Sequence, residues 1–233
     1  MTSPVANRRV DLRIDGHAEI VTVDYEPWQA ETLTQALCQD AGYRFWFGDR
    51  FTTENVRRFF GFYLDGLVKG GGSLVTLRGR TGVPYRGAIF GWRRFGAPFP
   101  PNQFDGMMDA LGAAGQRRYL WFREQSQIPL STFGIAAADE HMTVRLNIGG
   151  LRPGHQNQGV GTRISMLSLA RYEAAGFQAP YVVSSSVAGQ RYIARCGYTA
   201  VEGGTIFESS YYGDPEPRGL LSIISFRDKG ARP

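Results

Sequence analysis

The chain has 233 residues, of which 42% are hydrophobic and 13% aromatic, as expected of a globular protein with a substantial core. Its two cysteines are too few for a disulfide framework and are typical of a reducing compartment. The net charge of +5 is spread over separated arginine pairs, which argues against a nucleic-acid binder. No apolar run approaches the length of a membrane span or signal peptide, so we expect a cytoplasmic protein that binds neither nucleic acid nor membrane.

Apolar periodicity, caps and glycines predict a mixed α/β protein. The elements expected in chain order are a leader at 1–10, extended stretches within 11–25, helices at 27–40 and 51–69, a hairpin of strands at 73–78 and 85–95, a short helix near 103–113, a strand at 141–148, a helix at 162–175, a strand at 181–185, a helix at 187–195, and strands at 198–201 and 220–226.

The strand at 141–148 alternates cleanly between apolar and polar residues, so two sets of side chains should point to opposite faces. One set is Met142, Val144, Leu146 and Ile148, and the other is His141, Thr143, Arg145 and Asn147. A polar file on a strand in the middle of the sheet is unusual. It indicates that this face opens toward a binding site.

A glycine-rich loop, Gln156-Asn157-Gln158-Gly159-Val160-Gly161, separates this strand from the next helix. Glycines at such a junction let a ligand approach the backbone, and the first turn of a helix offers free amides and a positive dipole end. The loop is therefore a candidate pyrophosphate site. The dinucleotide-binding and Walker A patterns are both absent, because neither the third glycine nor the lysine of those motifs is present.

The stretch 151–162 resembles the acetyl-CoA motif of the GCN5-related N-acetyltransferase superfamily, an Arg/Gln-x-x-Gly-x-Gly/Ala loop. Gln156, Gly159 and Gly161 occupy the three signature positions. The resemblance continues through the strand at 181–183, a short helix and Gly197-Tyr198, which stands where the family has a Gly-Phe pair.

The resemblance implies one acyltransferase domain over 1–233, built on a single mixed, mostly antiparallel sheet flanked by helices, with an insertion at 96–140 before the central strand. It implies acetyl-CoA as co-substrate and no metal. In the family the strands corresponding to 141–151 and 181–185 splay apart around the pantetheine. A bulge at the Gly149-Gly150 pair would suit this approach, and the Leu151 amide would polarise the thioester carbonyl. The expected cofactor-binding residues are Gly149, Leu151, Gln156, Asn157, Gln158, Gly159, Val160, Gly161, Thr162 and Ser186.

The acid and base of the transfer depart from the family pattern. Ile193 stands where the family usually has the tyrosine that protonates the thiolate, which leaves Tyr192 and Tyr198 as candidates. Histidine is the usual general base near neutral pH, so His141 is the natural candidate base, with Asp139, Glu140 or water as alternatives. Two further residues, Arg145 and Asn147, are expected to orient the polar groups of the acceptor.

These features predict an N-acetyltransferase that acts on a primary amine of a small molecule, such as an amino sugar or a nucleoside. A protein or peptide acceptor is an alternative, as is a non-catalytic module that binds acyl-CoA without transfer. The long aromatic segment 96–140 would either wall the acceptor site and set its specificity or form the contact of a homodimer.

Overall fold

The computed structural model of the protein describes residues 19–78 and 82–227. The leader at 1–10 and the first part of 11–25 lie outside these residues. The elements are β1 Glu19–Val23, α1 Pro27–Leu37, α2 Ala41–Phe47, η1 Gly48–Arg50, α3 Thr53–Lys69, β2 Ser73–Arg78, β3 Ala88–Arg94, α4 Pro101–Gln125, η2 Leu130–Phe133, η3 Ala137–Met142, β4 Val144–Leu151, α5 Val160–Ala174, β5 Tyr181–Ser184, α6 Val187–Arg195, β6 Thr199–Phe207, α7 Glu208–Tyr212 and β7 Leu220–Phe226.

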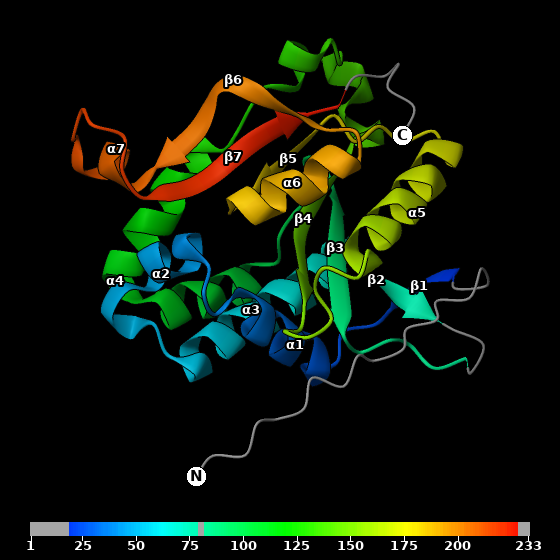
Figure 1. The fold of residues 1–233 in the computed structure, drawn as a ribbon, viewed down its shortest axis with the longest axis horizontal. Helices are drawn as coiled ribbons and strands as arrows, with labels where there is room; N and C mark the ends of the chain where they lie inside the picture. The colour runs from blue at the N-terminus through cyan, green and yellow to red at the C-terminus, as the bar shows by residue number, and fades with distance from the viewer. Residues whose placement is uncertain (1–18, 79–81, 228–233) are drawn as a thin grey trace.

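Strands β1, β2, β3 and β4 form an antiparallel sheet in that order (Figure 1). Helices α1 and α3 pack on one face of this sheet, and α5 packs on the other. Successive strand residues point to opposite faces, so Ile89 of β3 is buried in the α1–α3 layer while Phe90 and Trp92 are buried in the α5 layer. The sheet is therefore covered on both sides.

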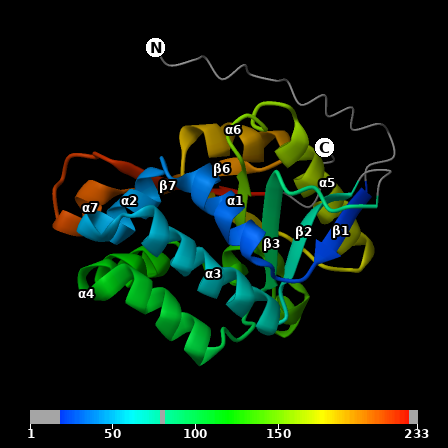
Figure 2. The ribbon, with the colours of Figure 1, turned by 90° about the horizontal axis from the view of Figure 1, so that it is seen from below.

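Helix α3 is the centre of the helical layer, between α1 and α4 (Figure 2). The Thr52 hydroxyl accepts a hydrogen bond from the Asn55 amide at 3.2 Å and caps the helix. The apolar residues at helical spacing are Val56, Phe59, Phe60, Tyr63, Leu64 and Leu67. All are buried except Tyr63, which is half-buried. The helix ends at Gly70, whose amide donates back to the Gly66 carbonyl.

A second antiparallel sheet has the strand order β5-β7-β6. Its strand β5 lies beside β4, but the described residues form only one bridge between the two sheets, a parallel pairing of Thr143 with Gln178. At this end the Val144 amide donates to the Gln178 carbonyl at 2.8 Å. Beyond the bridge β4 and β5 separate, so the predicted splay is confirmed and the expected single sheet is divided in two.

Strand β4 carries a bulge at Asn147. Ile148 pairs with Gly91 of β3 and Leu146 pairs with Trp92, which leaves Asn147 as an extra residue without a partner. A bulge of this kind bends the strand and re-aims its side chains. The sequence analysis predicted the bulge at the glycine pair, and the structure places it two residues earlier.

The bulge also corrects the predicted alternation of the strand. Val144 packs in the α5 layer, whereas Ile148 packs in the α1–α3 layer, because the extra residue reverses the facing of the strand beyond it. The expectation that Val144, Leu146 and Ile148 all share one face is therefore wrong. The polar file is also shorter than predicted, because the strand begins at Val144 and His141 belongs to η3.

The glycine pair remains inside β4 and does not end it. A Cβ on Gly149 would lie 2.6 Å from the ring of Phe90, and a Cβ on Gly150 would lie 2.8 Å from Ala36. Side chains from both layers thus press against the strand at this point, and only glycine leaves them room.

Helix α4 corrects the prediction for residues 96–140. A short helix near 103–113 was expected, whereas α4 continues to Gln125 through a kink at Gly112, whose φ of 68° is not helical. The aromatic stretch after it is helical as well, with Tyr119 and Phe122 three residues apart and buried against the helical layer. No helix in the described part of the chain is both long and apolar enough to cross a bilayer.

Candidate functional site

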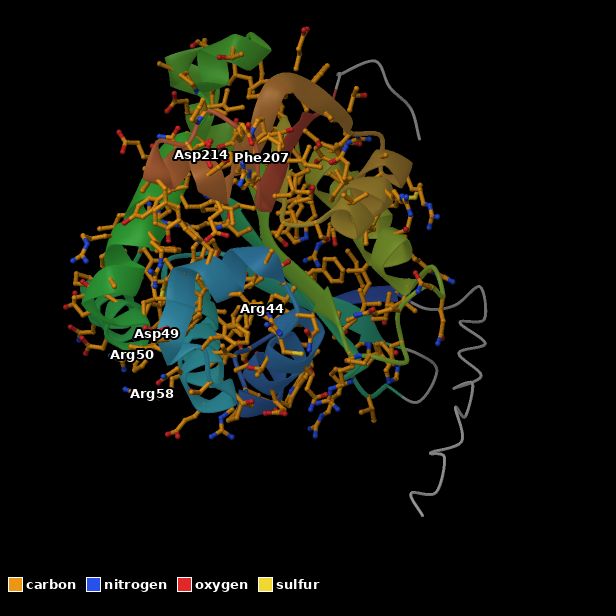
Figure 3. The ribbon with its side chains drawn as sticks, turned by 60° about the vertical axis from the view of Figure 1, so that its left-hand side comes forward. Arg44, Asp49, Arg50, Arg58, Phe207 and Asp214 are labelled. Carbon is orange, nitrogen blue, oxygen red and sulfur yellow. The ribbon has the colours of Figure 1, made fainter. Side chains whose placement is uncertain are left out.

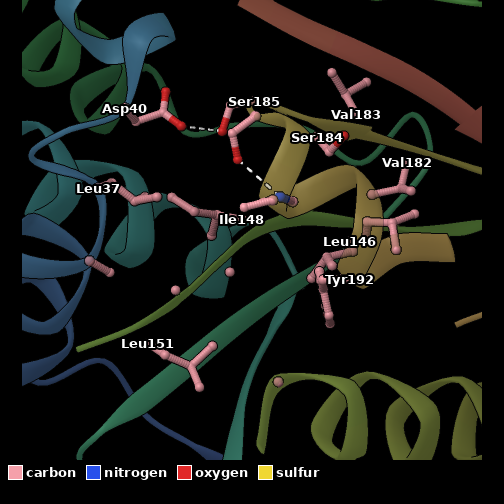
Figure 4. Close-up of a pocket in the computed structure, with 18 of the residues that line it drawn as sticks. Leu37, Asp40, Leu146, Ile148, Leu151, Val182, Val183, Ser184, Ser185 and Tyr192 are labelled. Atoms are coloured by element: carbon pink, nitrogen blue, oxygen red, sulfur yellow. Dashed lines mark hydrogen bonds between the residues drawn. The ribbon is translucent and has the colours of Figure 1, made fainter. Parts of the chain in front are cut away.

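The divergence of β4 and β5 opens a main cavity of about 640 Å³ (Figure 4). This volume lies within the usual range for small-molecule and cofactor sites. One wall is the β4 segment 146–151, the opposite wall is the β5 segment 182–186, and one end is the glycine-rich loop with the first turn of α5. The cavity is therefore built from the segments that the sequence analysis singled out.

The glycine-rich loop presents unpaired amides at this end of the cavity. Gly159 takes a left-handed conformation with φ 76°. Asn157, with φ 60°, is the only non-glycine residue with a positive φ among the described residues. The backbone hydrogen bonds found among the described residues include none donated by the amides of residues 157–162. No side chain caps α5. An anion placed here would meet several free donors and the positive end of a helix dipole.

The predicted cofactor-binding residues gather at the main cavity with one exception. Those that line it are Gly149, Leu151, Gln156, Asn157, Gly159, Val160, Gly161, Thr162 and Ser186. Gln158 does not, because its exposed side chain turns back and donates to the Gly154 carbonyl at 2.7 Å. Ser186 caps α6 by accepting from the Gly189 amide at 3.0 Å, which explains why a serine suits this position.

Arginine side chains of α6 add positive charge to the same cavity. Arg191 and Arg195 both line it and are largely exposed. They lie four residues apart and therefore share one face of the helix. The sequence analysis missed them, because basic residues on a short surface helix look like ordinary solvated charge.

Asp40 is the only carboxylate among the described residues that line the main cavity. It caps α2 by accepting from the Gly42 amide at 2.9 Å, and its other oxygen accepts a hydrogen bond from the Ser185 hydroxyl (Figure 4). Burial raises the pKa of Asp40 above its ordinary value, and the hydrogen bonds from Ser185, Tyr43 and Gly42 partly offset this. The sequence analysis overlooked Asp40, because an aspartate before a helix is a common cap.

A side cavity of about 130 Å³ adjoins the main one. The two share lining residues from four elements, namely Tyr43, Trp46, Phe122, Leu146, Asn147 and Val183. The segment 96–140 supplies much of the remaining wall, with Phe99, Phe104, Met107, Tyr119, Arg123 and Ser126. No described aspartate, glutamate, histidine or cysteine lines the side cavity.

Arg145 and Asn147, the predicted acceptor-binding pair, lie at the side cavity in one hydrogen-bonded network. Arg145 Nε donates to Asn147 Oδ1 at 2.8 Å, and its Nη1 donates to the Tyr181 hydroxyl at 2.9 Å. Asn147 Nδ2 donates to the Tyr63 hydroxyl of α3 at 3.1 Å. The bulge thus brings Asn147 to the junction of the two cavities, where a donor and an acceptor would meet.

The three predicted catalytic residues have different surroundings. His141 is exposed in η3 and lines neither cavity, so the structure does not bring it to the site. Tyr198 is buried, and its hydroxyl donates to the Ala179 carbonyl at 3.0 Å, away from both cavities. Tyr192 lines the main cavity while its hydroxyl bonds to that of Ser165 on α5, and burial raises its pKa well above the ordinary value.

Two other chemically reactive side chains, His155 and Cys196, line neither cavity. The His155 ring contacts Tyr85, to whose hydroxyl it is hydrogen-bonded through Nδ1. Cys196 is buried, and burial raises the pKa of its thiol to about 11. A thiol of this kind is a poor nucleophile at neutral pH.

No protein-family model and no curated protein sequence matches the chain. Solved structures do match it. One is the "histone acetyltransferase HPA2 and related acetyltransferase" from Corynebacterium glutamicum. It is 17% identical, with a TM-score of 0.53, and the match covers 93% of this chain and 98% of the other. Another is arylalkylamine N-acetyltransferase 2 from Aedes aegypti, with 10% identity, a TM-score of 0.54, and coverage of 90% and 98%. The chain therefore shares the fold of these two acetyltransferases.

Proposed function

We propose that the protein is an acyl-CoA-dependent N-acyltransferase that moves an acetyl group from acetyl-CoA to a primary amine of a small molecule. The observation that carries the proposal is the continuity of the main cavity. The cavity extends from the glycine-rich loop, whose free amides suit a pyrophosphate, to the edge of β4 that pairs with no other described strand. A nucleotide with a long, narrow, amide-containing arm fits both parts.

The strand edge of β4 offers hydrogen-bonding groups at regular intervals. The Arg152 amide donates to the Gly87 carbonyl of the chain before β3. In an antiparallel ladder successive residues alternate between partner strands, so the amides of Gly149 and Leu151 face the cavity. Gln156 already uses the Leu151 carbonyl on that side, donating to it at 3.1 Å. Pantetheine amides could pair with this edge as a further strand would, and the expected role of the Leu151 amide remains part of the proposal.

A bound acetyl-CoA supplies a thioester whose acetyl carbon passes to the amine nitrogen while the carbon–sulfur bond breaks. The attacking amine must lose a proton. Asp40 is the candidate base, because it is the only carboxylate on the described cavity walls and its raised pKa makes it a stronger base than an exposed aspartate. Ser185 would hold it in position. Asp40 thus takes the role that the sequence analysis gave to His141.

Tyr192 remains the candidate acid for the departing thiolate. Its raised pKa keeps the phenol protonated at neutral pH, and it lines the main cavity. The hydroxyl is also bonded to Ser165, which limits its reach. Since a thiol ordinarily has a pKa of about 8.5, the thiolate is a tolerable leaving group, and solvent can supply the proton if Tyr192 does not.

The side cavity is the proposed acceptor site, and the helix α4 that walls it is the proposed determinant of specificity. Its small volume and largely aromatic wall favour a compact metabolite over a protein chain, which would need a longer groove. The alternative of a homodimer contact for segment 96–140 stays a prediction. Its helix α4 does leave Leu120 47% exposed on the outside.

The test is turnover of acetyl-CoA with a broad panel of primary amines, read by mass spectrometry of the N-acetyl product. We expect at least one amine to give a product at a rate far above the amine-free blank. Saturable binding of CoA with no product from any amine would instead favour the non-catalytic module. That rival is motivated by Ile193, which stands where the family has its tyrosine and is 3% exposed.

A further inference from the structure

Three arginines converge on the side cavity from three different elements. They are Arg93 of β3, Arg123 of α4 and Arg145 of β4. We call them the arginine cluster. Each is half-buried, and no described carboxylate lies within ion-pair distance of any of them. An enclosed group of like charges without counter-charge disfavours folding unless something compensates it.

Other arginines of the helical layer have a different setting. Arg44, Arg50 and Arg58 are exposed on the outside of α2, η1 and α3 (Figure 3). Charges of that kind are solvated and need no partner. The arginine cluster therefore differs from these arginines in being half-buried around one cavity.

The guanidinium groups of the cluster are held in place by their neighbours. Arg93 lies over the ring of Phe99, with 5.4 Å between the guanidinium carbon and the ring centroid, and Arg123 lies over Tyr119 at 6.0 Å. Arg145 is fixed by its hydrogen bonds to Asn147 and Tyr181. Stacking of this kind orients a guanidinium and leaves its edge free for an anion.

Donor capacity remains in the cluster. Arg93 donates through Nη2 to the Ala97 carbonyl, but its Nε is buried and has no hydrogen-bond partner among the described residues. Burial lowers the pKa of Arg93, Tyr63 partly offsets this, and the charges of Arg145 and Arg123 lower it again. All three arginines line the same small cavity. Buried donors without a partner are uncommon in folded proteins, so the surroundings of Arg93 leave its hydrogen-bonding capacity incompletely used.

We propose that the acceptor amine also bears a carboxylate, which the arginine cluster binds in the side cavity. This inference rests on the proposed function and names its substrate class. The carboxylate would lie between Arg93, Arg123 and Arg145, and the amine would point past Asn147 into the main cavity. A guanidinium matches a carboxylate with two parallel hydrogen bonds, and the small cavity suits the short spacing of an amino acid.

The experiment compares kcat/KM for amines that differ by the carboxylate alone, with acetyl-CoA as donor. Suitable pairs are glycine with methylamine, alanine with ethylamine, phenylalanine with phenethylamine and tyrosine with tyramine. A charge-assisted hydrogen bond contributes about 1.5–3 kcal/mol, equivalent to about 10- to 100-fold. We expect the carboxylate-bearing member of at least one pair to be preferred by about that factor. Preference for the simple amine in every pair that turns over would overturn the inference.

Arg123→Gln is the informative variant, because it removes one charge of the cluster at a position on the surface of α4. It should raise KM for the carboxylate-bearing amine about 10-fold more than it raises KM for the simple partner. Arg117→Gln is the matched control, since Arg117 lies on the same helix, is exposed and lines neither cavity. Equal effects of Arg123→Gln on both members of a pair would contradict a carboxylate site.

Two further experiments test the carboxylate site independently of turnover and distinguish it from a site for a carboxylate on the acyl donor. If no amine turns over, calorimetric titration of the CoA-saturated protein with N-acetylphenylalanine and N-acetylphenethylamine decides it. N-acetylphenylalanine should bind more tightly than N-acetylphenethylamine, and Arg123→Gln should abolish that difference. Equal affinities of the two compounds for the unmodified protein would overturn the inference, whether or not the protein is an enzyme. In the second experiment, a preference for succinyl-CoA over acetyl-CoA with a simple amine, lost in Arg123→Gln, would place the carboxylate on the donor and also overturn the inference.

Discussion

At the scale of single residues, the site depends on Asp40 serving two purposes. It caps α2 through the Gly42 amide and faces a cavity that contains no other described carboxylate. These purposes can be separated by mutation, because asparagine is as good a helix cap as aspartate but cannot accept a proton at neutral pH.

Asp40→Asn should therefore lower kcat/KM by about 10²- to 10⁴-fold, the usual contribution of a general base. The affinity for CoA, measured by calorimetry, should change little because the cap and the phosphate loop remain intact. An activity within about twofold of the unmodified protein would exclude Asp40 as the base.

The pH dependence of kcat/KM gives an independent test of Asp40. Activity should fall as the pH drops through the raised pKa of this carboxyl, because only the ionised form accepts a proton. The Ser185 hydroxyl lowers the pKa of Asp40, so Ser185→Ala should move the acidic limb to higher pH. A limb that stays in place, or that persists in Asp40→Asn, would assign it to another group.

The raised pKa of Asp40 also affects the stability of the fold, in the opposite direction to the lowered pKa of a carboxylate in an ion pair. Burial raises the folded-state pKa of Asp40, so the ionised form disfavours the fold. This unfavourable contribution is absent below the unfolded-state pKa and complete above the folded-state pKa. Asp40→Asn should therefore lose less stability at neutral pH than at low pH, as measured by urea unfolding.

At the scale of elements, the strand–loop–helix unit of β4, residues 152–159 and α5 is the phosphate site. Gly159 and Gly154 both have positive φ and open space where a Cβ would be, so alanine strains the backbone equally at either position. Only Gly159 lines the main cavity and precedes the free amides of α5.

Gly159→Ala should weaken CoA binding about 10-fold or more in calorimetry, whereas Gly154→Ala should lose similar stability with little effect on affinity. The comparison separates a general cost of strain, on the order of 1 kcal/mol, from displacement of the amides. Equal CoA affinities of the two variants would show that the loop amides do not bind CoA.

Elements with a strong local signal were predictable from the sequence. Helix α6 was predicted with the bounds that it has, because Ser186 caps it and Gly197 follows it. Two long-range effects could not be predicted. The Asn147 bulge depends on the register between β3 and β4, and the continuation of α4 past Gly112 depends on packing against α3.

The part of the site that forms a contiguous motif was predictable from the sequence, and the part that is assembled only in the fold was not. The loop residues form a contiguous motif, so nine of the ten expected cofactor-binding residues line the cavity. Asp40 and Ser185 are separated by 145 positions in the chain and meet only in the fold. His141 was favoured because a histidine is a natural base and because it belonged to the polar file, but the strand on which it was placed begins three residues later.

At the scale of the whole molecule, the two sheets form a wedge held at its narrow end by the bridge between Thr143 and Gln178. The helical layer contacts both sheets, since α1 packs on β4 and α2 packs on β7. A ligand in the main cavity would therefore touch both sheets and stabilise them together, which is consistent with the proposed single domain.

CoA should accordingly raise the melting temperature of the whole chain in one transition. Saturation at 100 times Kd contributes about 2.7 kcal/mol, which corresponds to a rise of about 5–10 °C for a chain of this size. Differential scanning calorimetry measures this. Two transitions, of which CoA moves only one, would contradict a single cooperative domain.

The central claim is that acyl-CoA binds between β4 and β5 with its pyrophosphate on the loop. Hydrogen exchange followed by mass spectrometry, with and without saturating CoA, tests this claim most directly. Peptides covering 156–163 and 146–151 should exchange more slowly with CoA, while peptides of β1 and β2, which do not line the cavity, should be unchanged. Unaltered exchange of the loop amides at saturating CoA would contradict the account.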